Sequence, residues 1–286
     1  MLCRIPLCIL ALILTSVPSW GAELFYMDHD PFTDRYVGPV GPLVISGEIA
    51  PGDYDRLLSK IMDDESRFML QNKIILASDG GDVAESMRIA ALIKATFTGI
   101  LVGPLTGRCV SACFFIYAAA AQREADGTRL IGINRPYLVD SDAGLSKTDP
   151  SSAETRALLQ VRAFLSENAV PNYLVDEMFR HASDDAYWLS LDDEKNLGYR
   201  SPSFDRYLKA KCAWEEGMER DVLAGKRTVE DLKQMLRCRT LATQADAHKA
   251  LLQAVTNRRA PPIPGSPKQA ATGGPAESVP PKSSSE

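Results

Sequence analysis

Residues 72–96 read NKIILASDGGDVAESMRIAALIKAT, and this stretch decides the fold. It begins with an apolar run at 72–77 that is typical of a buried strand. The run passes into Ser-Asp-Gly-Gly-Asp at 78–82, and residues 83–96 then place apolar side chains at helical spacing. A buried strand, a glycine turn and a helix in this order predict the first half of a parallel crossover unit.

Strand and helix patterns alternate on both sides of this unit. The further strand candidates lie at 43–49, 99–102, 129–133 and 187–190, and the helix candidates at 53–62, 112–121, 153–166, 170–180 and 192–197. This alternation predicts an α/β domain over residues 41–200. Charged amphipathic patterns at 204–224 and 228–255 predict a helical hairpin extension over residues 201–257.

Both ends of the chain differ in composition from the domain. Arg4 precedes an apolar run at 7–14, and the small residues Ser19 and Gly21 predict a signal peptide, 1–21, cleaved after Gly21. A permanent membrane anchor is the less favoured alternative, because the run is shorter than the roughly 20 residues of a spanning helix. We therefore expect an exported, periplasmic protein with no integral membrane segment after signal removal.

Two flanking segments have little capacity to fold. Residues 22–40 contain the helix and strand breakers Pro31 and Pro39, and we expect this N-terminal segment to be irregular. Residues 258–286 are rich in Pro, Ser, Gly and Ala, and such a composition buries too little apolar surface to offset its ordering entropy. We predict that this tail is disordered.

Four cysteines remain after the predicted cleavage, and an oxidising compartment permits disulfides between them. Cys212 and Cys238 flank two helical patterns, and we expect them to form a bridge. Cys109 and Cys113 could either bridge across a turn or pack as two buried thiols. No histidine or second close cysteine pair stands nearby, so we predict no metal site and no cofactor. The net charge of -5 argues against nucleic-acid binding.

A second glycine-containing turn, at 107–111, ends in Ser111 and opens the apolar helix pattern at 112–121. A serine at a helix N-terminus lies beside free N–H donors and the positive end of the helix dipole. The N–H groups of Gly81 and Ala112, next to Gly80, could bind a developing oxyanion, and each such donor contributes about 3 kcal/mol in acyl-transfer enzymes.

Four motifs in this order resemble those of the proteolytic subunit of Clp protease and its exported relatives. The chain has Ser-Asp-Gly-Gly at 78–81 where that family has Ser-Pro-Gly-Gly, and Ser111 follows Gly81 by thirty residues. Asn-Arg-Pro at 134–136 stands where the family has His-Gln-Pro or His-Arg-Pro. Two aspartates at 184–185 precede a hydrophobic-Ser element and a helix that ends in Leu-Gly at 197–198.

The resemblance implies a Clp/crotonase-type spiral of βαβ units with a helical C-terminal extension. It implies Ser111 as the nucleophile, position 134 as the base, Asp185 as the residue that orients the base, and Gly81 as half of an oxyanion hole. It further implies a peptide or protein ligand in the Ser111 cleft and a possible homo-oligomer, since family members often form rings.

The chain departs from the family at Asn134, because an amide has no titratable lone pair with which to accept the serine proton. Asn134 could instead hydrogen-bond Ser111, and Asp185 would then orient nothing. Two replacement bases have weaker support. Lys147 lies thirty-six residues after Ser111 in a polar segment where a solvated lysine is favoured, and His181 at a helix end is more simply a solvated cap.

Asp79 replaces the family's proline beside the glycines, and its carboxylate would oppose the charge of an oxyanion. Two functions follow from these residues. The first is a serine-peptidase-like hydrolase of the cell envelope that is weak or inactive as a peptidase because Asn134 replaces the histidine. The alternative is a non-catalytic module that binds a peptide or protein in the same cleft.

Overall fold

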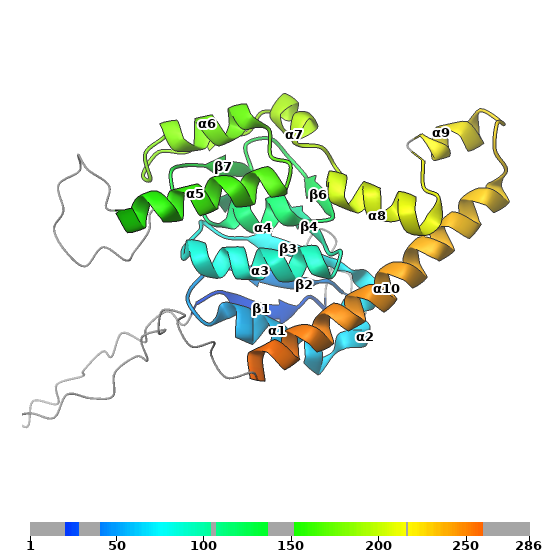
Figure 1. Ribbon diagram of the computed structural model, residues 1–286, viewed down its shortest axis with the longest axis horizontal. Helices are drawn as coiled ribbons and strands as arrows, with labels where there is room; N and C mark the ends of the chain where they lie inside the picture. The colour runs from blue at the N-terminus through cyan, green and yellow to red at the C-terminus, as the bar shows by residue number, and fades with distance from the viewer. Residues whose placement is uncertain (1–20, 29–40, 104–106, 137–151, 216, 260–286) are drawn as a thin grey trace, which may run out of the picture.

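The computed structural model describes residues 21–28, 41–103, 107–136, 152–215 and 217–259 (Figure 1). The predicted signal peptide up to residue 20, Lys147 and the tail from residue 260 lie outside the described residues. Among the described residues, no helix is both long enough and apolar enough to cross a membrane.

Strands and helices alternate through the first two thirds of the chain, and helices alone follow. In chain order the elements are β1 (Glu23–Tyr26), β2 (Leu43–Ser46), α1 (Asp53–Asp63), α2 (Glu65–Gln71), β3 (Lys73–Ala77), α3 (Val83–Ala95), β4 (Gly99–Val102), β5 (Cys109–Val110), α4 (Cys113–Ala119), β6 (Gln122–Ala125), β7 (Ile131–Ile133), α5 (Ser152–Glu167), α6 (Asn172–Arg180), β8 (Tyr187–Trp188), α7 (Leu191–Leu197), α8 (Pro202–Cys212), α9 (Met218–Leu223) and α10 (Val229–Arg259).

The larger sheet has the strand order β1-β2-β3-β4-β6. β1 pairs antiparallel with β2, and every other neighbouring pair is parallel. A smaller sheet has the order β5-β7-β8, with a parallel and an antiparallel pair. A single bridge from Ser78 to Cys109 joins the end of β3 to β5. The predicted α/β fold class, with parallel crossovers and a helical C-terminal region, is confirmed.

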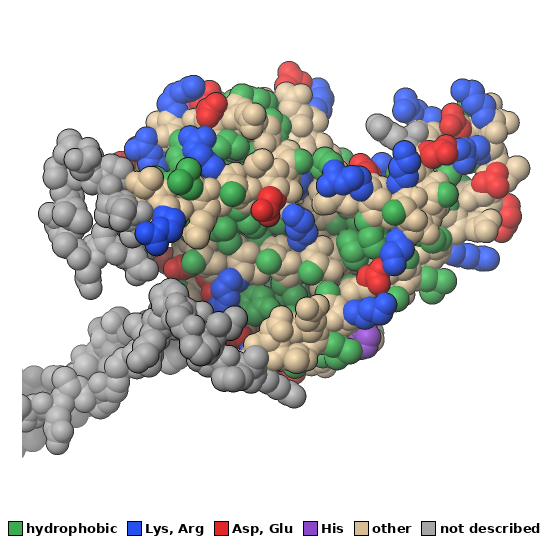
Figure 2. Space-filling model, in the orientation of Figure 1, with side chains coloured by type: hydrophobic (Ala, Val, Ile, Leu, Met, Phe, Trp, Pro, Cys, Tyr) green, Lys and Arg blue, Asp and Glu red, His purple; other side chains and the backbone are tan. Residues whose placement is uncertain are grey.

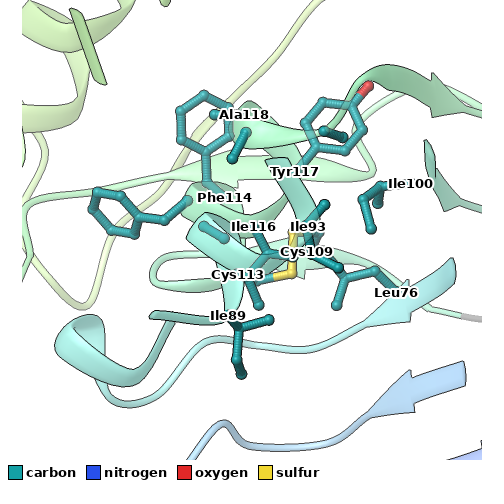
Figure 3. Packing of buried hydrophobic residues seen from close by; sticks show 14 of the residues in the cluster. Leu76, Ile89, Ile93, Ile100, Cys109, Cys113, Phe114, Ile116, Tyr117 and Ala118 are labelled. Atoms are coloured by element: carbon teal, nitrogen blue, oxygen red, sulfur yellow. A yellow bond between two sulfur atoms is a disulfide. The ribbon is translucent and has the colours of Figure 1, made fainter. Parts of the chain in front are cut away.

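Helix α4 forms the centre of the core, and all seven of its residues are buried. It packs against α3, and Figure 3 shows its side chains meeting those of α3 and of strands β3 and β4. The Cys109–Cys113 disulfide lies inside this cluster, with both residues fully buried. Phe115 meets Phe164 of α5 edge to face, with ring centroids 5.8 Å apart. The serine turn at the start of α4 therefore rests on the most tightly packed part of the protein.

Some elements near the two ends of the described chain differ from the sequence expectations. Residues 23–26, expected to be irregular, form β1. Exposed and partly buried residues alternate along this strand, which pairs with β2 at the edge of the sheet. The helix expected over 204–224 ends at Cys212, where Ala213 takes a left-handed φ of 51°. A separate short helix, α9, then begins after Gly217, whose φ is 83°.

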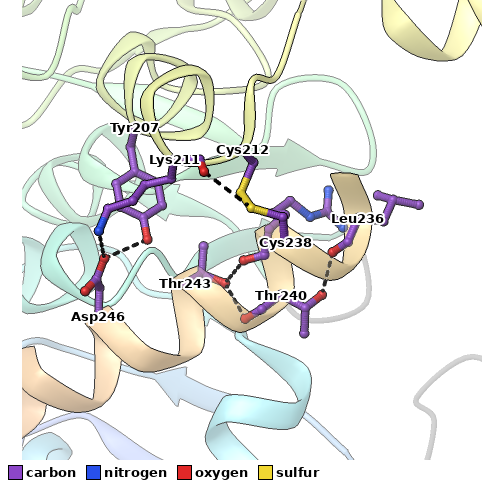
Figure 4. Close-up of a disulfide and its surroundings, with 9 residues drawn as sticks. Tyr207, Lys211, Cys212, Leu236, Cys238, Thr240, Thr243 and Asp246 are labelled. Atoms are coloured by element: carbon purple, nitrogen blue, oxygen red, sulfur yellow. Dashed lines mark hydrogen bonds and ion pairs between the residues drawn. A yellow bond between two sulfur atoms is a disulfide. The ribbon is translucent and has the colours of Figure 1, made fainter. Parts of the chain in front are cut away.

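Helix α10 runs back across the domain and contacts α8, α1 and α3 (Figure 1). The bridge expected between Cys212 and Cys238 is present and joins α8 to α10 (Figure 4). Next to it, the Tyr207 hydroxyl donates to Asp246 over 2.9 Å, and Lys211 lies 3.2 Å from the same carboxylate. Figure 2 shows basic and acidic side chains interspersed over the α8–α10 end of the molecule.

Candidate active site

Ser111 occupies a sharp turn between β5 and α4. Its φ of 57° lies in the left-handed region, which a residue with a side chain adopts only when the surrounding structure holds it there. Two backbone hydrogen bonds do so: the Ser111 N–H donates to Gly132 over 3.0 Å, and the Val110 N–H donates to Ser78 over 2.9 Å. The turn is thus fixed to β7 on one side and to the end of β3 on the other.

The Gly80-Gly81 turn lies directly against Ser111. Both glycines have left-handed φ values, 112° for Gly80 and 130° for Gly81. A Cβ on Gly80 would stand 2.8 Å from the Ser111 Cβ, and one on Gly81 would stand 2.1 Å from the Ile49 carbonyl oxygen. Any side chain at either position would push these segments apart, so glycine is required for the close approach.

Two backbone donors flank Ser111 without an acceptor. The N–H groups of Gly81 and Ala112 have no hydrogen-bond partner among the residues that the structure describes. The Ala112 nitrogen lies close to Gly80, since a Cβ there would be 3.2 Å from it. Free N–H groups at a helix start are the components of an oxyanion-binding site.

Asn134 follows β7, as the motif order predicts, and its side chain binds the backbone of a segment far away in sequence. Its Nδ2 donates to the Ser183 carbonyl over 2.8 Å, and its buried Oδ1 has no partner within the described parts of the chain. No hydrogen bond joins Asn134 to Ser111 among the described residues. The Ser111 hydroxyl has no hydrogen-bond partner among the described residues.

Asp185 pairs with a histidine instead of with residue 134. Its carboxylate lies 3.0 Å from His181 Nδ1, and Glu177 lies 3.7 Å from His181 Nε2. The Asp185 side chain is 70% exposed. The Arg135 N–H donates to the His181 carbonyl over 3.0 Å, so this group of His181, Asp185 and Glu177 borders the Asn134 segment. His181 was expected to be a solvated cap at a helix end, yet the fold brings it to this edge beside Asp185.

The Asp79 carboxylate is neutralised by a neighbour that the sequence did not single out. Arg108 Nε donates to Asp79 over 2.6 Å, and this hydrogen bond raises the pKa of Arg108. The Arg108 guanidinium also lies over the Trp188 ring, 5.7 Å from its centroid. The expected opposition between Asp79 and an oxyanion is weakened, because the carboxylate is paired with a cation.

A cleft of about 890 Å³ opens beside the Gly80-Gly81 turn. It lies at the carboxyl ends of β2 and β3, where ligands bind in sheets of parallel strands. Its lining combines backbone from glycine turns, two arginines and one large aromatic ring, and Ser111 lies next to it, behind Gly80. The lining residues are Ser46, Gly47, Glu48, Ala77, Ser78, Asp79, Gly80, Gly81, Gly107, Arg108, Arg129, Leu130 and Trp188.

The Cys109–Cys113 disulfide spans the serine turn. The two Cα atoms are 5.3 Å apart, and both cysteines are fully buried. The spacing in sequence left the bridge and two separate thiols equally open, and the fold places the sulfur atoms together. A covalent link from β5 to α4 limits how far Ser111 can move between them.

The described residues contain no group of three or more His, Cys, Asp or Glu side chains arranged to hold a metal ion. The charged residues at the cleft, Glu48, Asp79, Arg108 and Arg129, come from different turns. The cleft thus offers polar contacts and an aromatic surface to a ligand.

No family model matches the chain, and no curated protein matches it. Among solved structures, it is similar to a mutant of the 1510-N membrane-bound stomatin-specific protease, with 19% identity over 60% of this chain and 83% of that chain and a TM-score of 0.39. It is also similar to ClpP1 from Listeria monocytogenes, with 19% identity over 55% of this chain and 86% of that chain and a TM-score of 0.38.

A second mutant of the stomatin-specific protease, in complex with a substrate peptide, has 18% identity over 55% of this chain and 70% of that chain and a TM-score of 0.37. All three proteins are thus like this chain at low identity and low TM-score. At that level their activities do not transfer to this chain.

Proposed function

We propose that this chain is a Clp-protease-like serine hydrolase domain of the cell envelope that holds a peptide beside Ser111 and hydrolyses it weakly or not at all. One observation carries the proposal: the Asn134 amide is bound to Ser183, and the Ser111 hydroxyl has no partner among the described residues. The turn, the glycines and two free N–H groups support a hydrolase-like site, and no basic side chain hydrogen-bonds the Ser111 hydroxyl among the described residues.

The replacement of the base would have a large effect on the rate of hydrolysis. A serine hydroxyl is a poor nucleophile until a neighbouring group takes its proton. In serine proteases, disabling the orienting aspartate lowers turnover by roughly four orders of magnitude and removing the base by roughly six, and the oxyanion donors alone retain a small part of the acceleration. Gly81 and Ala112 would supply that residual part here, and efficient peptide turnover is not expected.

Peptide binding is supported by the composition of the cleft. An extended segment can lie along the carboxyl ends of β2 and β3, where the backbone of Gly47 and Gly80 approaches without side chains. Trp188 offers an apolar surface, and Arg108 and Arg129 offer donors to backbone or side-chain oxygens of the ligand. A location in the cell envelope is supported by the signal-like N-terminus and by two disulfides, which persist in oxidising compartments.

The decisive test is labelling with a fluorophosphonate, which reacts with activated serines. We expect slow or no labelling of the wild-type chain and faster labelling of Asn134→His, in which a base returns beside an intact turn. Ser111→Ala is the control and must remain unlabelled in both backgrounds. Rapid stoichiometric labelling of the wild-type Ser111 would contradict the weak-or-inactive part of the proposal.

Peptide binding is tested separately, by the fluorescence anisotropy of a labelled extended-peptide library. Trp188→Ala should weaken binding, whereas Ser111→Ala should leave it unchanged because the hydroxyl is not needed for binding. Tyr199→Ala is a matched control, since Tyr199 is an exposed aromatic residue that does not line the cleft. The resemblance to Clp-type proteins also implies a homo-oligomer, and native mass spectrometry of the purified chain tests for it.

The contact between His181 and Asp185 favours a second candidate, an active hydrolase in which His181 serves as the base. The carboxylate 3.0 Å from Nδ1 would orient the ring as the aspartate of a triad does. In that case the wild-type chain is labelled readily, and His181→Ala abolishes labelling. If His181→Ala has no effect on labelling, the pair is a surface contact only.

A further inference from the structure

The Asp53 carboxylate is buried beneath the first described residues of the chain. Asp53 is 2% exposed, and one of its oxygens accepts hydrogen bonds from the Ala22 N–H over 2.9 Å and from the Ala50 N–H over 2.8 Å. Its other oxygen lies 2.6 Å from Arg56, whose side chain is 46% exposed. A buried carboxylate is costly unless charges or donors compensate it, and the donor that comes from farthest away in sequence is the nitrogen of Ala22.

Ala22 is held firmly in this position. It is fully buried, its methyl group belongs to the main hydrophobic core, and the next residue begins the pairing of β1 with β2. Gly21 has a φ of 72°, and a Cβ there would lie 2.4 Å from an Asp53 oxygen. The chain before Ala22 thus passes the carboxylate at a distance that only glycine permits.

The sequence independently predicts cleavage of an export leader between Gly21 and Ala22. We infer that this cleavage releases the α-amino group of Ala22 directly onto the buried Asp53 carboxylate, forming an ion pair that fixes the start of the domain. In the step, a leader peptidase adds water across the Gly21–Ala22 bond. The C–N bond breaks, Gly21 leaves with a carboxylate, and the Ala22 amine takes up a proton.

The change from amide to ammonium strengthens a contact that already exists. An amide N–H is neutral, whereas the ammonium has three donors and a positive charge, and charge-assisted hydrogen bonds are roughly twice as strong as neutral ones. Because Asp53 is buried and Arg56 reaches it from a partly exposed position, a second cation offsets the cost of burying the carboxylate. Ala22 needs no rearrangement, since its side chain and the following strand already hold it.

The ion pair is connected to the Gly80-Gly81 turn. Asp53 holds the Ala50 N–H, and the preceding residue, Ile49, donates to the Gly80 carbonyl over 2.8 Å. The Ile49 carbonyl accepts from the Asp82 N–H over 2.8 Å. Leader removal would therefore tighten the segment on which the glycines beside Ser111 are built, whether or not Ser111 is reactive.

The first experiment replaces Gly21 by Ala in the full precursor. Leader peptidases accept alanine before the cleaved bond, so we expect a secreted chain that begins at Ala22 and melts at the wild-type temperature. If the intact mass shows that residue 21 is retained, the inference is overturned. A retained alanine would also collide with Asp53 and lower the melting temperature.

The second experiment measures the reactivity of the α-amine in the mature chain with an acylating reagent at neutral pH. Raising an amine pKa by one unit lowers its neutral fraction about tenfold, and we expect at least that protection at Ala22. Asp53→Asn should remove the protection, and Asp63→Asn, an exposed carboxylate on the same helix, should retain it. An unprotected amine in the wild-type chain overturns the inference.

Should Asp53→Asn fail to fold, a chain with residues 19–21 retained tests the same contact with Asp53 intact. It should melt several degrees below the chain that begins at Ala22. Equal melting temperatures would show that the free amine adds nothing and would overturn the inference.

Discussion

Gly80 and Ser111 lie so close that a Cβ added to Gly80 would stand 2.8 Å from the Ser111 Cβ. The same Cβ would be 3.0 Å from the Val110 carbonyl oxygen and 3.2 Å from the Ala112 nitrogen. These contacts come from backbone and from a side chain that cannot rotate away. The absence of a side chain at position 80 is thus what allows the glycine turn and the serine turn to meet.

Gly80→Ala should destabilise the protein more than the same change at Gly52. Both glycines have similar left-handed φ values, 112° and 99°, so alanine is strained by about 1 kcal/mol at either position. Only at Gly80 does the methyl group meet other atoms, which adds about 1–3 kcal/mol for overpacking. Urea unfolding of the two variants measures the difference, and equal losses would contradict the close packing of the two turns.

The two disulfides should differ in their sensitivity to a mild reductant. Cys109 and Cys113 are fully buried, whereas Cys212 and Cys238 are partly exposed between α8 and α10. Exchange requires a thiolate to reach a sulfur atom, so the Cys212–Cys238 pair should be reduced first. Alkylation followed by peptide mass spectrometry identifies the order. Simultaneous reduction of both pairs would show that the core around the serine turn opens as easily as the extension.

Asp193→Asn should destabilise the protein near neutral pH and much less in acid. Burial raises the pKa of Asp193, but hydrogen bonds from Ser190, Tyr173 and Tyr187 outweigh it and lower the pKa. A depressed folded-state pKa gives stability that is present above the unfolded value of about 3.9 and is lost as pH falls through the folded value. Chemical unfolding of the wild type and of Asp193→Asn at several pH values measures how the difference in unfolding free energy changes with pH.

For Asp193→Asn, hydrogen bonds to a charged group predict a loss of about 1.5–3 kcal/mol at pH 7. Asp192→Asn is the control, because that side chain is 84% exposed and pairs with the exposed Lys195. A loss at Asp193 that does not shrink in acid would mean that the carboxylate charge is not what the three donors stabilise.

The serine turn could be predicted from the sequence because its determinants are local. Glycines at 80–81, a serine before an apolar run and the order of strands and helices all lie within a few residues of the structure that they specify. The orientation of the Asn134 side chain could not be predicted from the sequence, because its partner is the carbonyl of Ser183, 49 residues away. The sequence also left open whether Cys109 and Cys113 form a disulfide or remain two buried thiols. Their spacing permits both, and the fold brings the two sulfur atoms together.

Strand β6 was missed for a related reason. Its sequence, Gln-Arg-Glu-Ala, lacks the apolar and β-branched residues that indicate a strand, yet it pairs with β4 at the edge of the sheet. Its second residue, Arg123, is only 3% exposed. Arginine is rarely buried unless it is paired, so the residue type alone predicts an exposed side chain. Backbone carbonyls of Ala118, Asn168 and Leu197 stabilise that side chain, and two of these residues lie more than 40 residues away in sequence.

Arg123 is therefore predicted to be among the most sensitive positions in the fold. Its guanidinium donates to the carbonyls of Leu197, Ala118 and Asn168 over 2.6–2.9 Å, which joins α7, α4 and the end of α5. Burial lowers the pKa of Arg123 to about 10, so the side chain stays charged at neutral pH. Arg123→Met leaves the three carbonyls without donors, and unpaired buried groups cost about 1–3 kcal/mol each.

We expect Arg123→Met to lose at least about 3 kcal/mol of unfolding free energy, because more than one carbonyl is left unpaired. Arg206→Met, on an exposed position of α8, should change stability by less than about 0.5 kcal/mol. Arg123→Lys keeps the charge but cannot reach three acceptors with a planar fork, so it should fall between the two. If Arg123→Met unfolds at the wild-type urea concentration, the guanidinium does not join these segments, and apolar packing alone holds α7 against the domain.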